Sequence, residues 1–296
     1  MDPRLTTLKL ETLLRSLPDL LMPRVCLVCG RQLLPTERHL CLCCEADLPL
    51  THFEDCSRNP MADRYNARLV DAGCGDSYQY ATSLFYYGTG SGYDYIPQAL
   101  KYGRNFGAGR HFARMLGGLI AGAEHFRDVD LVTCVPLHWT RRYRRGYNQA
   151  AVIASEIARC LNAARSAAAP AEPECTGSTG PVEARGNYSA GPEPVIFAPH
   201  LLRRTRRTAT QTRLSVADKA LNVAGAFAVR RHYLPPSPTP LSFRAQPRNL
   251  LPRHILLVDD VFTTGSTLSA CAEALFEAFG PEVRVSIATL ACVPQR

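Results

Sequence analysis

Two adjacent carboxylates followed by a hydroxyl-rich loop are the residues of this chain best suited to ligand chemistry. An apolar run, Ile255 to Val258, leads into Asp259 and Asp260, and a Thr-Thr-Gly-Ser-Thr loop follows. The apolar run predicts a buried strand of a parallel sheet, which would deliver the acidic pair to the carboxyl edge of that sheet. Ligands of open α/β sheets bind at that edge, so the carboxylates would face vicinal hydroxyls or a hydrated Mg²⁺.

The loop after the acidic pair has the composition of a phosphate-binding turn. Thr263, Thr264, Ser266 and Thr267 offer hydroxyls, and Gly265 lets the backbone approach an anion closely. A helix predicted over 268–279 adds the N–H groups and the dipole of a helix N-terminus. The whole pattern indicates a site for a phosphorylated sugar. The alternative is that these residues form only a strand end, a turn and a helix cap.

Cysteines near the N-terminus have the spacing of a zinc site. Six of the 12 cysteines lie in the stretch 26–56, where Cys26-Leu-Val-Cys29 is followed after eleven residues by Cys41-Leu-Cys43-Cys44. Two Cys-x-x-Cys knuckles can place four thiolates tetrahedrally around Zn²⁺. We expect Cys26, Cys29, Cys41 and Cys44 to be the metal ligands, with Cys43 as the alternative to one of them. Incidental reduced thiols are the competing interpretation.

Length and composition are typical of a soluble α/β protein. The chain has 296 residues, 46% of them apolar, which is enough for a main domain and a small appendage. No stretch approaches the roughly 20 apolar residues that span a bilayer. The leucine-spaced N-terminus suits an amphipathic helix and not a signal peptide. We therefore expect a cytoplasmic protein without membrane insertion.

The positive charge of this chain is carried by arginine. The net charge is +8, and Lys9, Lys101 and Lys219 are the only lysines. Because a guanidinium contacts phosphate through two parallel donors, this balance points to phosphorylated ligands or nucleic acid. The arginines cluster at 141–145 and again at 203–207. A solvated basic face is the competing interpretation for either cluster.

Strands and helices alternate along the chain. Strands are predicted at 81–87, 129–136, 255–258 and 283–292, and helices at 93–101, 109–125, 148–161 and 268–279. This alternation predicts a parallel sheet flanked by helices. Residues 1–50 form the N-terminal helix and zinc module, 51–80 a loop-rich connector, and 81–296 the α/β domain. Composition predicts a disordered insertion at about 164–194 and an exposed loop at about 235–250.

Three further motifs accompany the acidic pair and its loop. They are Val135-Pro136-Leu137-His138 followed by Arg144-Arg145-Gly146-Tyr147-Asn148-Gln149-Ala150, then Thr210-Gln211-Thr212-Arg213-Leu214-Ser215, and Leu100-Lys101-Tyr102. Together these motifs resemble those of the ComF family, which is named for competence, the uptake of external DNA. The resemblance covers nearly the whole chain apart from the two insertions. It implies a type I phosphoribosyltransferase-like parallel sheet flanked by helices, with a small N-terminal zinc ribbon. Because Cys56 and Cys74 are isolated here, we expect one zinc ion.

The resemblance also implies that the site binds phosphoribosyl pyrophosphate (PRPP) with Mg²⁺. Asp259 and Asp260 would hold the ribose hydroxyls and Mg²⁺. The 5′-phosphate would lie against Thr263, Thr264, Gly265, Ser266 and Thr267. For pyrophosphate the candidates are Leu137, His138, Arg142 and Arg145, with Lys101 as a weaker one, and His138 is alternatively a structural residue behind its loop. Residues 203–215 would form a loop that closes over the substrate.

Two classes of function remain open. The first is an enzyme, a phosphoribosyltransferase that transfers ribose 5-phosphate from PRPP to an acceptor that the sequence does not reveal. The second is a non-catalytic protein that senses PRPP or a nucleotide in the same pocket and engages single-stranded DNA or a competence translocation protein. In the second class Tyr143 and Tyr147 would stack on bases, although both also suit packing between helices.

Overall fold

The computed structural model describes most of the α/β domain and the cysteine module. The described residues are 23–74, 77–88, 90–102, 105–137, 143, 146–168, 193–205, 225–234 and 251–294. The predicted N-terminal helix, the exposed loop at 235–250 and most of the predicted insertion lie outside these residues. So do His138, Arg142 and Arg145, and most of the predicted closing loop.

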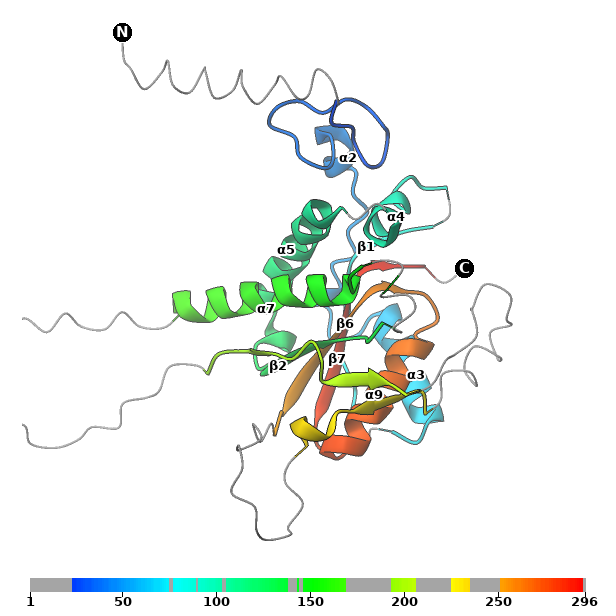
Figure 1. Cartoon of the computed structure of the whole chain (residues 1–296), viewed down its shortest axis with the longest axis vertical. Coiled ribbons are helices and arrows are strands. Elements are labelled where there is room, and N and C mark those ends of the chain that lie inside the picture. Colours follow the sequence, from blue (N-terminus) through cyan, green and yellow to red (C-terminus); the bar gives the residue numbers. More distant parts are fainter. Residues whose placement is uncertain are drawn as a thin grey trace, which may run out of the picture.

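A five-stranded parallel sheet with the strand order β1-β7-β6-β2-β3 forms the centre of the described fold (Figure 1). The strands are β1 (Ala81–Tyr86), β2 (Leu131–Cys134), β3 (Ile196–Phe197), β6 (His254–Phe262) and β7 (Arg284–Cys292). The apolar run predicted as a buried strand lies in β6, at the middle of the sheet. The predicted fold class is confirmed.

Helices cover both faces of the sheet, so β6 is apolar on both of its sides. One face carries α4 (Tyr95–Tyr102), α5 (Phe106–Gly122) and α7 (Gln149–Ala168), and the other carries α3 (Pro60–Asp71) and α9 (Ser266–Phe279) (Figure 1). Successive strand residues point to opposite faces. Accordingly, Leu256 and Val258 join the first core, and Ile255 and Leu257 join the second. Within the described residues, no helix has the length and apolar character needed to cross a membrane.

A small antiparallel pair of strands packs on the α9 side of the sheet. It consists of β4 (Leu202–Arg204) and β5 (Phe227–Val229), and Leu202, Phe227 and Val229 are buried in the same core as α9. The alternation of strands and helices in the sequence did not predict this pair, because its two strands are short and 22 residues lie between them. The pair carries Arg203 and Arg204 to the carboxyl side of the main sheet, next to the end of β2.

The connector predicted to be loop-rich contains α3, so that prediction was wrong. The helix begins after Asn59, whose side-chain Oδ1 accepts a hydrogen bond from the Ala62 N–H at 2.9 Å, and Pro60 occupies the first turn. An N-cap residue followed by proline is a helix-start pattern, and Met61, Tyr65 and Leu69 recur every four residues. The described connector therefore includes an amphipathic helix that buries one face against the sheet.

Helix α7 extends past its predicted end at Leu161 and reaches Ala168, so the disordered insertion cannot begin at 164. The residues after Leu161 are mostly alanine, which has the highest helix propensity. Near the end of the helix, Arg165 donates hydrogen bonds to the carbonyls of Arg127 at 3.0 Å and Val129 at 2.6 Å. These bonds fix the last turns of α7 to the segment that leads into β2.

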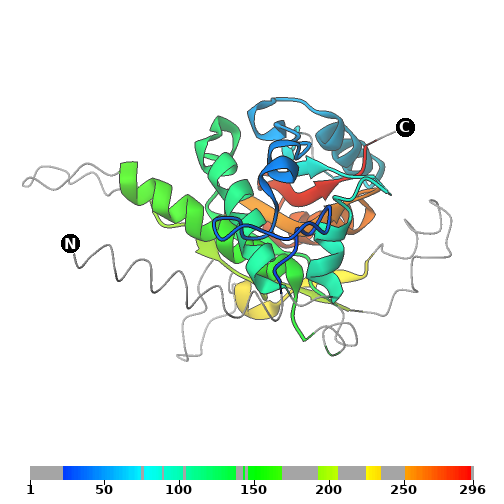
Figure 2. The ribbon, with the colours of Figure 1, turned by 90° about the horizontal axis from the view of Figure 1, so that it is seen from above.

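The cysteine module packs against α4 and α5 at one end of the molecule (Figures 1 and 2). Its buried Leu33 and Leu40 belong to the same hydrophobic core as Phe112 of α5. The Tyr93 hydroxyl just before α4 donates to the Cys44 carbonyl at 3.2 Å. The module and the α/β domain therefore share one continuous core.

His254 is a completely buried ionisable side chain at the start of β6. It lies at the amino ends of the strands, opposite the carboxyl ends that carry the acidic pair. Its Nδ1 lies 2.7 Å from Asp128 Oδ1 and its Nε2 lies 2.8 Å from Ser286 Oγ. Because a carboxylate only accepts hydrogen bonds, Nδ1 of the neutral ring carries the proton and Nε2 accepts from Ser286. Burial lowers the pKa of His254 to about 4, against a smaller opposing effect of the Asp130 charge. The ion pair of Asp128 with Arg284 offsets the nearest carboxylate charge.

We expect stability to decrease at mildly acidic pH through His254. The folded-state pKa lies below the ordinary value of 6.5, so the unfolded chain binds the proton more readily. The contribution is fully present above the unfolded pKa and is lost as the pH falls towards the folded one. Between about pH 7 and pH 5 the free energy of unfolding should fall by about 2 kcal/mol more than in His254→Gln. Denaturant unfolding at both pH values measures this difference in the free energy of unfolding. The control is His200→Gln, because His200 is exposed. The same change of stability with pH in the unaltered protein and in both variants would contradict the prediction.

Candidate active site

Residues from the carboxyl ends of β1, β2 and β6 and from the starts of α7 and α9 line one cleft. Its volume is about 230 Å³. The lining includes Lys101, Leu137, Asp259, Asp260, Thr263, Thr264, Gly265, Ser266 and Thr267. The structure thus brings together every predicted PRPP-site residue that it describes.

The acidic pair lies inside β6 and not after its end, which corrects the sequence-based boundary. Asp259 pairs with Thr289 of β7, and the pairing continues to Phe262. The neighbouring strand β2 ends earlier, at Cys134 opposite Val258. Asp259 and Asp260 therefore project past the end of β2, at the carboxyl edge where the prediction placed them. The Asp260 N–H donates to Asp259 Oδ1 at 2.9 Å, which links the two carboxyl-bearing residues.

Lys101 at the end of α4 brings a positive charge to this pair. Its Nζ lies 3.2 Å from Asp260 Oδ2. Burial by itself would lower the pKa of Lys101, but the charge and hydrogen bond of Asp260 and the charge of Asp259 outweigh it and raise the pKa. The lysine is therefore charged at neutral pH, and the acidic pair already attracts a cation.

The hydroxyl-rich loop turns sharply at Gly265, which has φ of +79°. A Cβ atom there would lie 3.0 Å from the Phe262 ring, so both the backbone conformation and the close approach require glycine. Helix α9 starts at the next residue, Ser266, whose Oγ lies 2.9 Å from Thr264 Oγ1. Ser269 Oγ donates to the Gly265 carbonyl at 2.9 Å. These local hydrogen bonds stabilise the conformation of the loop.

Two arginines of α3 bind the loop from behind. Arg64 donates to the Thr263 carbonyl at 3.1 Å, and Arg68 donates to the Thr264 carbonyl. All described peptide bonds are trans, so the N–H that follows each carbonyl points the opposite way, away from α3. The N–H groups of Thr264 and Gly265 are thereby oriented as donors on the cleft side of the loop. Nothing in the local sequence around either arginine indicates this role.

Comparison with known proteins agrees with this geometry. A model of the phosphoribosyl transferase domain matches residues 196–296, which include β6, the acidic pair and the loop. Competence protein F of Haemophilus influenzae is 26% identical over 192 residues, 64% of this chain and 63% of that protein. DNA utilization protein YhgH of Escherichia coli K12 is 26% identical over 265 residues, 88% of both proteins. This chain is a homologue of these ComF proteins.

The ComF resemblance is thereby confirmed, and the chain contains a phosphoribosyl transferase domain. The chain spans just under two thirds of the length of competence protein F, at 63%. Four polar residues that line the cleft of this ComF homologue were not predicted as individual ligand contacts: Tyr87, Asn148, Gln149 and Arg204, the last of which was predicted only as part of the closing loop. Asn148 connects two of the family motifs, since its Nδ2 donates to the Val135 carbonyl at 3.0 Å. The asparagine-glutamine dipeptide of the family motif was the available sequence clue.

The two tyrosines near the basic cluster differ in their surroundings. The Tyr147 hydroxyl donates to the Leu100 carbonyl, and its ring lies 4.2 Å from that of Phe106. Tyr147 thus packs between α4, α5 and α7, in agreement with the packing interpretation. Tyr143 is 88% exposed.

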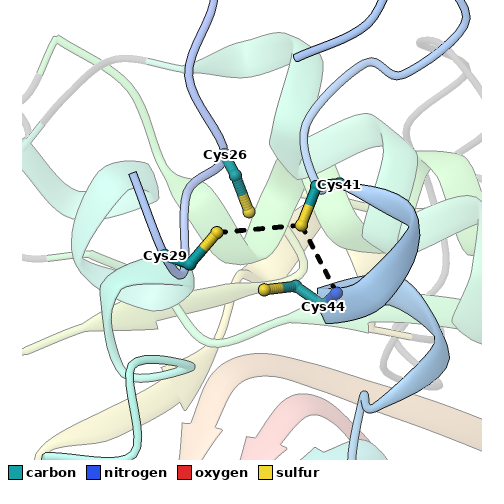
Figure 3. A group of neighbouring side chains, drawn as sticks. All are labelled: Cys26, Cys29, Cys41 and Cys44. Carbon is teal, nitrogen blue, oxygen red and sulfur yellow. Dashed lines mark hydrogen bonds between the residues drawn. The ribbon is translucent and has the colours of Figure 1, made fainter. Parts of the chain in front are cut away.

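Four cysteines of the N-terminal module converge on one point (Figure 3). The Sγ atoms of Cys26, Cys29, Cys41 and Cys44 all lie within 4.8 Å of one another. Cys43 is exposed and is not one of the four, although it lies in the same short helix as Cys44. The predicted set is therefore the one that the fold assembles. Four thiolates at this separation could hold a structural zinc ion.

Hydrogen bonds favour the thiolate form of Cys26 and Cys41, whereas burial and hydrogen bonds with the neighbouring cysteines raise the pKa of Cys44. Cys41 precedes the short helix α2 (Leu42–Ala46), and its Sγ accepts from the Cys44 N–H at 3.5 Å. Burial raises the pKa of Cys26, but hydrogen bonds from Cys29, Cys41 and Val28 outweigh it and lower the pKa to about 7. Glu37 links the segment between the knuckles to the second knuckle, because its carboxylate accepts hydrogen bonds from the N–H groups of Leu34 at 2.6 Å and Leu42 at 2.8 Å.

Proposed function

We propose that this protein is a phosphoribosyltransferase that binds PRPP with Mg²⁺ and transfers its ribose 5-phosphate group to an acceptor. The observation that carries the proposal is the cleft in which the acidic pair and the glycine-containing loop lie side by side. A role of this activity in DNA uptake is part of the proposal and is supported by the names of the homologues. A cytoplasmic location, where thiols stay reduced and available to a metal ion, is also part of the proposal.

The residues of the cleft fit each part of PRPP. Thr264, Gly265 and the first turn of α9 offer N–H groups and hydroxyls to the 5′-phosphate. Asp259 and Asp260 offer carboxylate oxygens to the ribose hydroxyls, and carboxylates are also the ligands that Mg²⁺ prefers. Asp259 and Asp260 would hold Mg²⁺, which would supply positive charge to the departing pyrophosphate. Lys101 next to Asp260 is placed to move from the carboxylate to a phosphate oxygen.

The reaction exchanges one bond at the anomeric carbon of the ribose. The bond from this carbon to the pyrophosphate oxygen breaks, and pyrophosphate leaves with the electron pair. The acceptor supplies the electron pair of the new bond and loses a proton. No protein group needs to form a covalent intermediate, so orientation and charge stabilisation account for catalysis.

Calorimetric titration with PRPP and Mg²⁺ tests the binding step, and pyrophosphate release tests turnover. We expect saturable one-site binding that requires Mg²⁺, followed by pyrophosphate release when a suitable acceptor is present. Binding without release for every acceptor tried would favour a sensor. Absence of binding by the zinc-loaded protein would refute the proposal.

A second candidate function is a non-catalytic partner in DNA uptake that binds single-stranded DNA. The names competence protein F and DNA utilization protein YhgH favour it. Phosphate contacts make such binding fall steeply with salt. A PRPP-dependent enzyme with a small acceptor predicts no salt-dependent binding of DNA, so a titration with single-stranded DNA at two salt concentrations separates the two.

A further inference from the structure

A second pocket adjoins the cleft and has arginines along its rim. Its volume is about 610 Å³, within the range that holds small organic ligands. We call it the arginine pocket, after Arg110, Arg203, Arg204 and Arg230 in its lining. The cleft and the arginine pocket share Pro136, Leu137, Asn148 and Arg204.

The charge of the arginine pocket favours an anion. Against the four arginines stands one described carboxylate, Glu156, which is buried. Arg114 and Arg159, outside the pocket lining, already bind Glu156, and Arg110 Nε lies 3.7 Å from it. The carboxylate charge is therefore more than offset. The residues just before and at the start of α7 also line the pocket, so the positive end of this 20-residue helix faces it.

An apolar part of the remaining lining suits a flat ring. It comprises Pro136, Ala151, Val152, Phe197, Pro199 and Leu202, and the polar side chains of Asn148, Ser155 and His200 also line the pocket. Phe197 is 36% exposed, which leaves part of its ring open for stacking. Arginines around an apolar, aromatic-containing wall match a ligand with a planar base and a phosphate group, because bases stack on apolar rings and phosphates bind guanidinium groups.

We infer that the arginine pocket binds a phosphate-bearing nucleotide unit, which is the acceptor of the ribosyl transfer. The acceptor role rests on the proposed function, whereas the binding site does not. A ligand there contacts Pro136 and Leu137, which also wall the cleft, so its base lies next to the PRPP site. A nitrogen or oxygen of that ligand forms the new bond to the anomeric carbon and loses a proton as pyrophosphate leaves. The unit is either a free 5′-mononucleotide or one nucleotide of a single strand.

Calorimetric titration of the zinc-loaded full chain tests the site, with thymidine 5′-monophosphate and a short single-stranded oligothymidylate as separate probes. We expect Arg203→Gln and Arg230→Gln each to raise the Kd about tenfold, because each removes a charged hydrogen bond to phosphate. Arg231→Gln is the matched control: Arg231 is exposed, adjacent in sequence, and outside the pocket lining. Its Kd should be unchanged. Tighter arginine-dependent binding of the oligonucleotide assigns the unit to a single strand, and equal binding assigns it to a free nucleotide.

Three results would overturn the inference: no binding of either probe, equal losses in Arg230→Gln and Arg231→Gln, or pyrophosphate binding as tightly as the nucleotide with the same arginine dependence. Titration of the same proteins with Mg²⁺ and PRPP separates this inference from the proposed function. Arg230 does not line the cleft, so PRPP binding should survive Arg230→Gln. If the protein binds the nucleotide in an Arg230-dependent way but does not bind PRPP, the nucleotide site is supported and the proposed transferase function is refuted.

Discussion

Replacing Asp259 and Asp260 together by asparagine is expected to weaken binding of PRPP with Mg²⁺ at least about a hundredfold. Each carboxylate lines the cleft and would contribute a charged hydrogen bond or a metal contact. Asparagine has nearly the same shape as aspartate but no charge. The substitutions should therefore leave β6 intact and remove the attraction of the carboxylates for the ribose hydroxyls and Mg²⁺. Calorimetric titration measures the loss directly.

Two controls separate a local effect from misfolding. Glu277→Gln removes a carboxylate from the exposed side of α9, near the opposite end of that helix from the loop. We expect this variant to bind PRPP like the unaltered protein. The asparagine double variant should retain its zinc content and melting temperature. If it binds PRPP undiminished, the PRPP site lies elsewhere and the proposed function loses its main support.

Removing zinc is expected to lower the melting temperature by at least about 10 °C. Cys26 and Cys41 are buried, and the adjoining Leu33 and Leu40 lie in the same core as α5. Loss of the metal would leave the knuckles without cross-links and loosen that shared core. Thermal unfolding before and after chelation measures the effect.

Cys41→Ser isolates the contribution of the metal. Serine is a favourable N-cap residue, so α2 keeps its cap while the site loses one thiolate. We expect this variant to lose most of its zinc, as measured by metal analysis, and to melt as early as the chelated protein. Cys43→Ser should keep both zinc and stability, because Cys43 is exposed and outside the cluster. Full zinc occupancy in Cys41→Ser would contradict the assignment of the ligands.

Features that depend on short stretches of chain could be predicted from the sequence alone. The four converging cysteines follow from two knuckles, each closed by a local turn, and the acidic pair with its loop follows from a strand, a glycine turn and a helix start. Alternating apolar segments determined the parallel sheet. Each of these patterns depends on the backbone geometry of neighbouring residues. The order of residues along the chain was therefore sufficient to predict them.

The residues that support the site from distant parts of the chain became evident from the three-dimensional fold. Arg64 and Arg68 lie 199 and 196 residues from the loop carbonyls that they bind, and Lys101 reaches Asp260 from another helix. The arginine pocket likewise draws Arg110, Arg203 and Arg230 from separate elements. Sequence periodicity reports which face of an element is buried but not which elements meet. The crossover connections of the β1-β7-β6-β2-β3 sheet bring these side chains together.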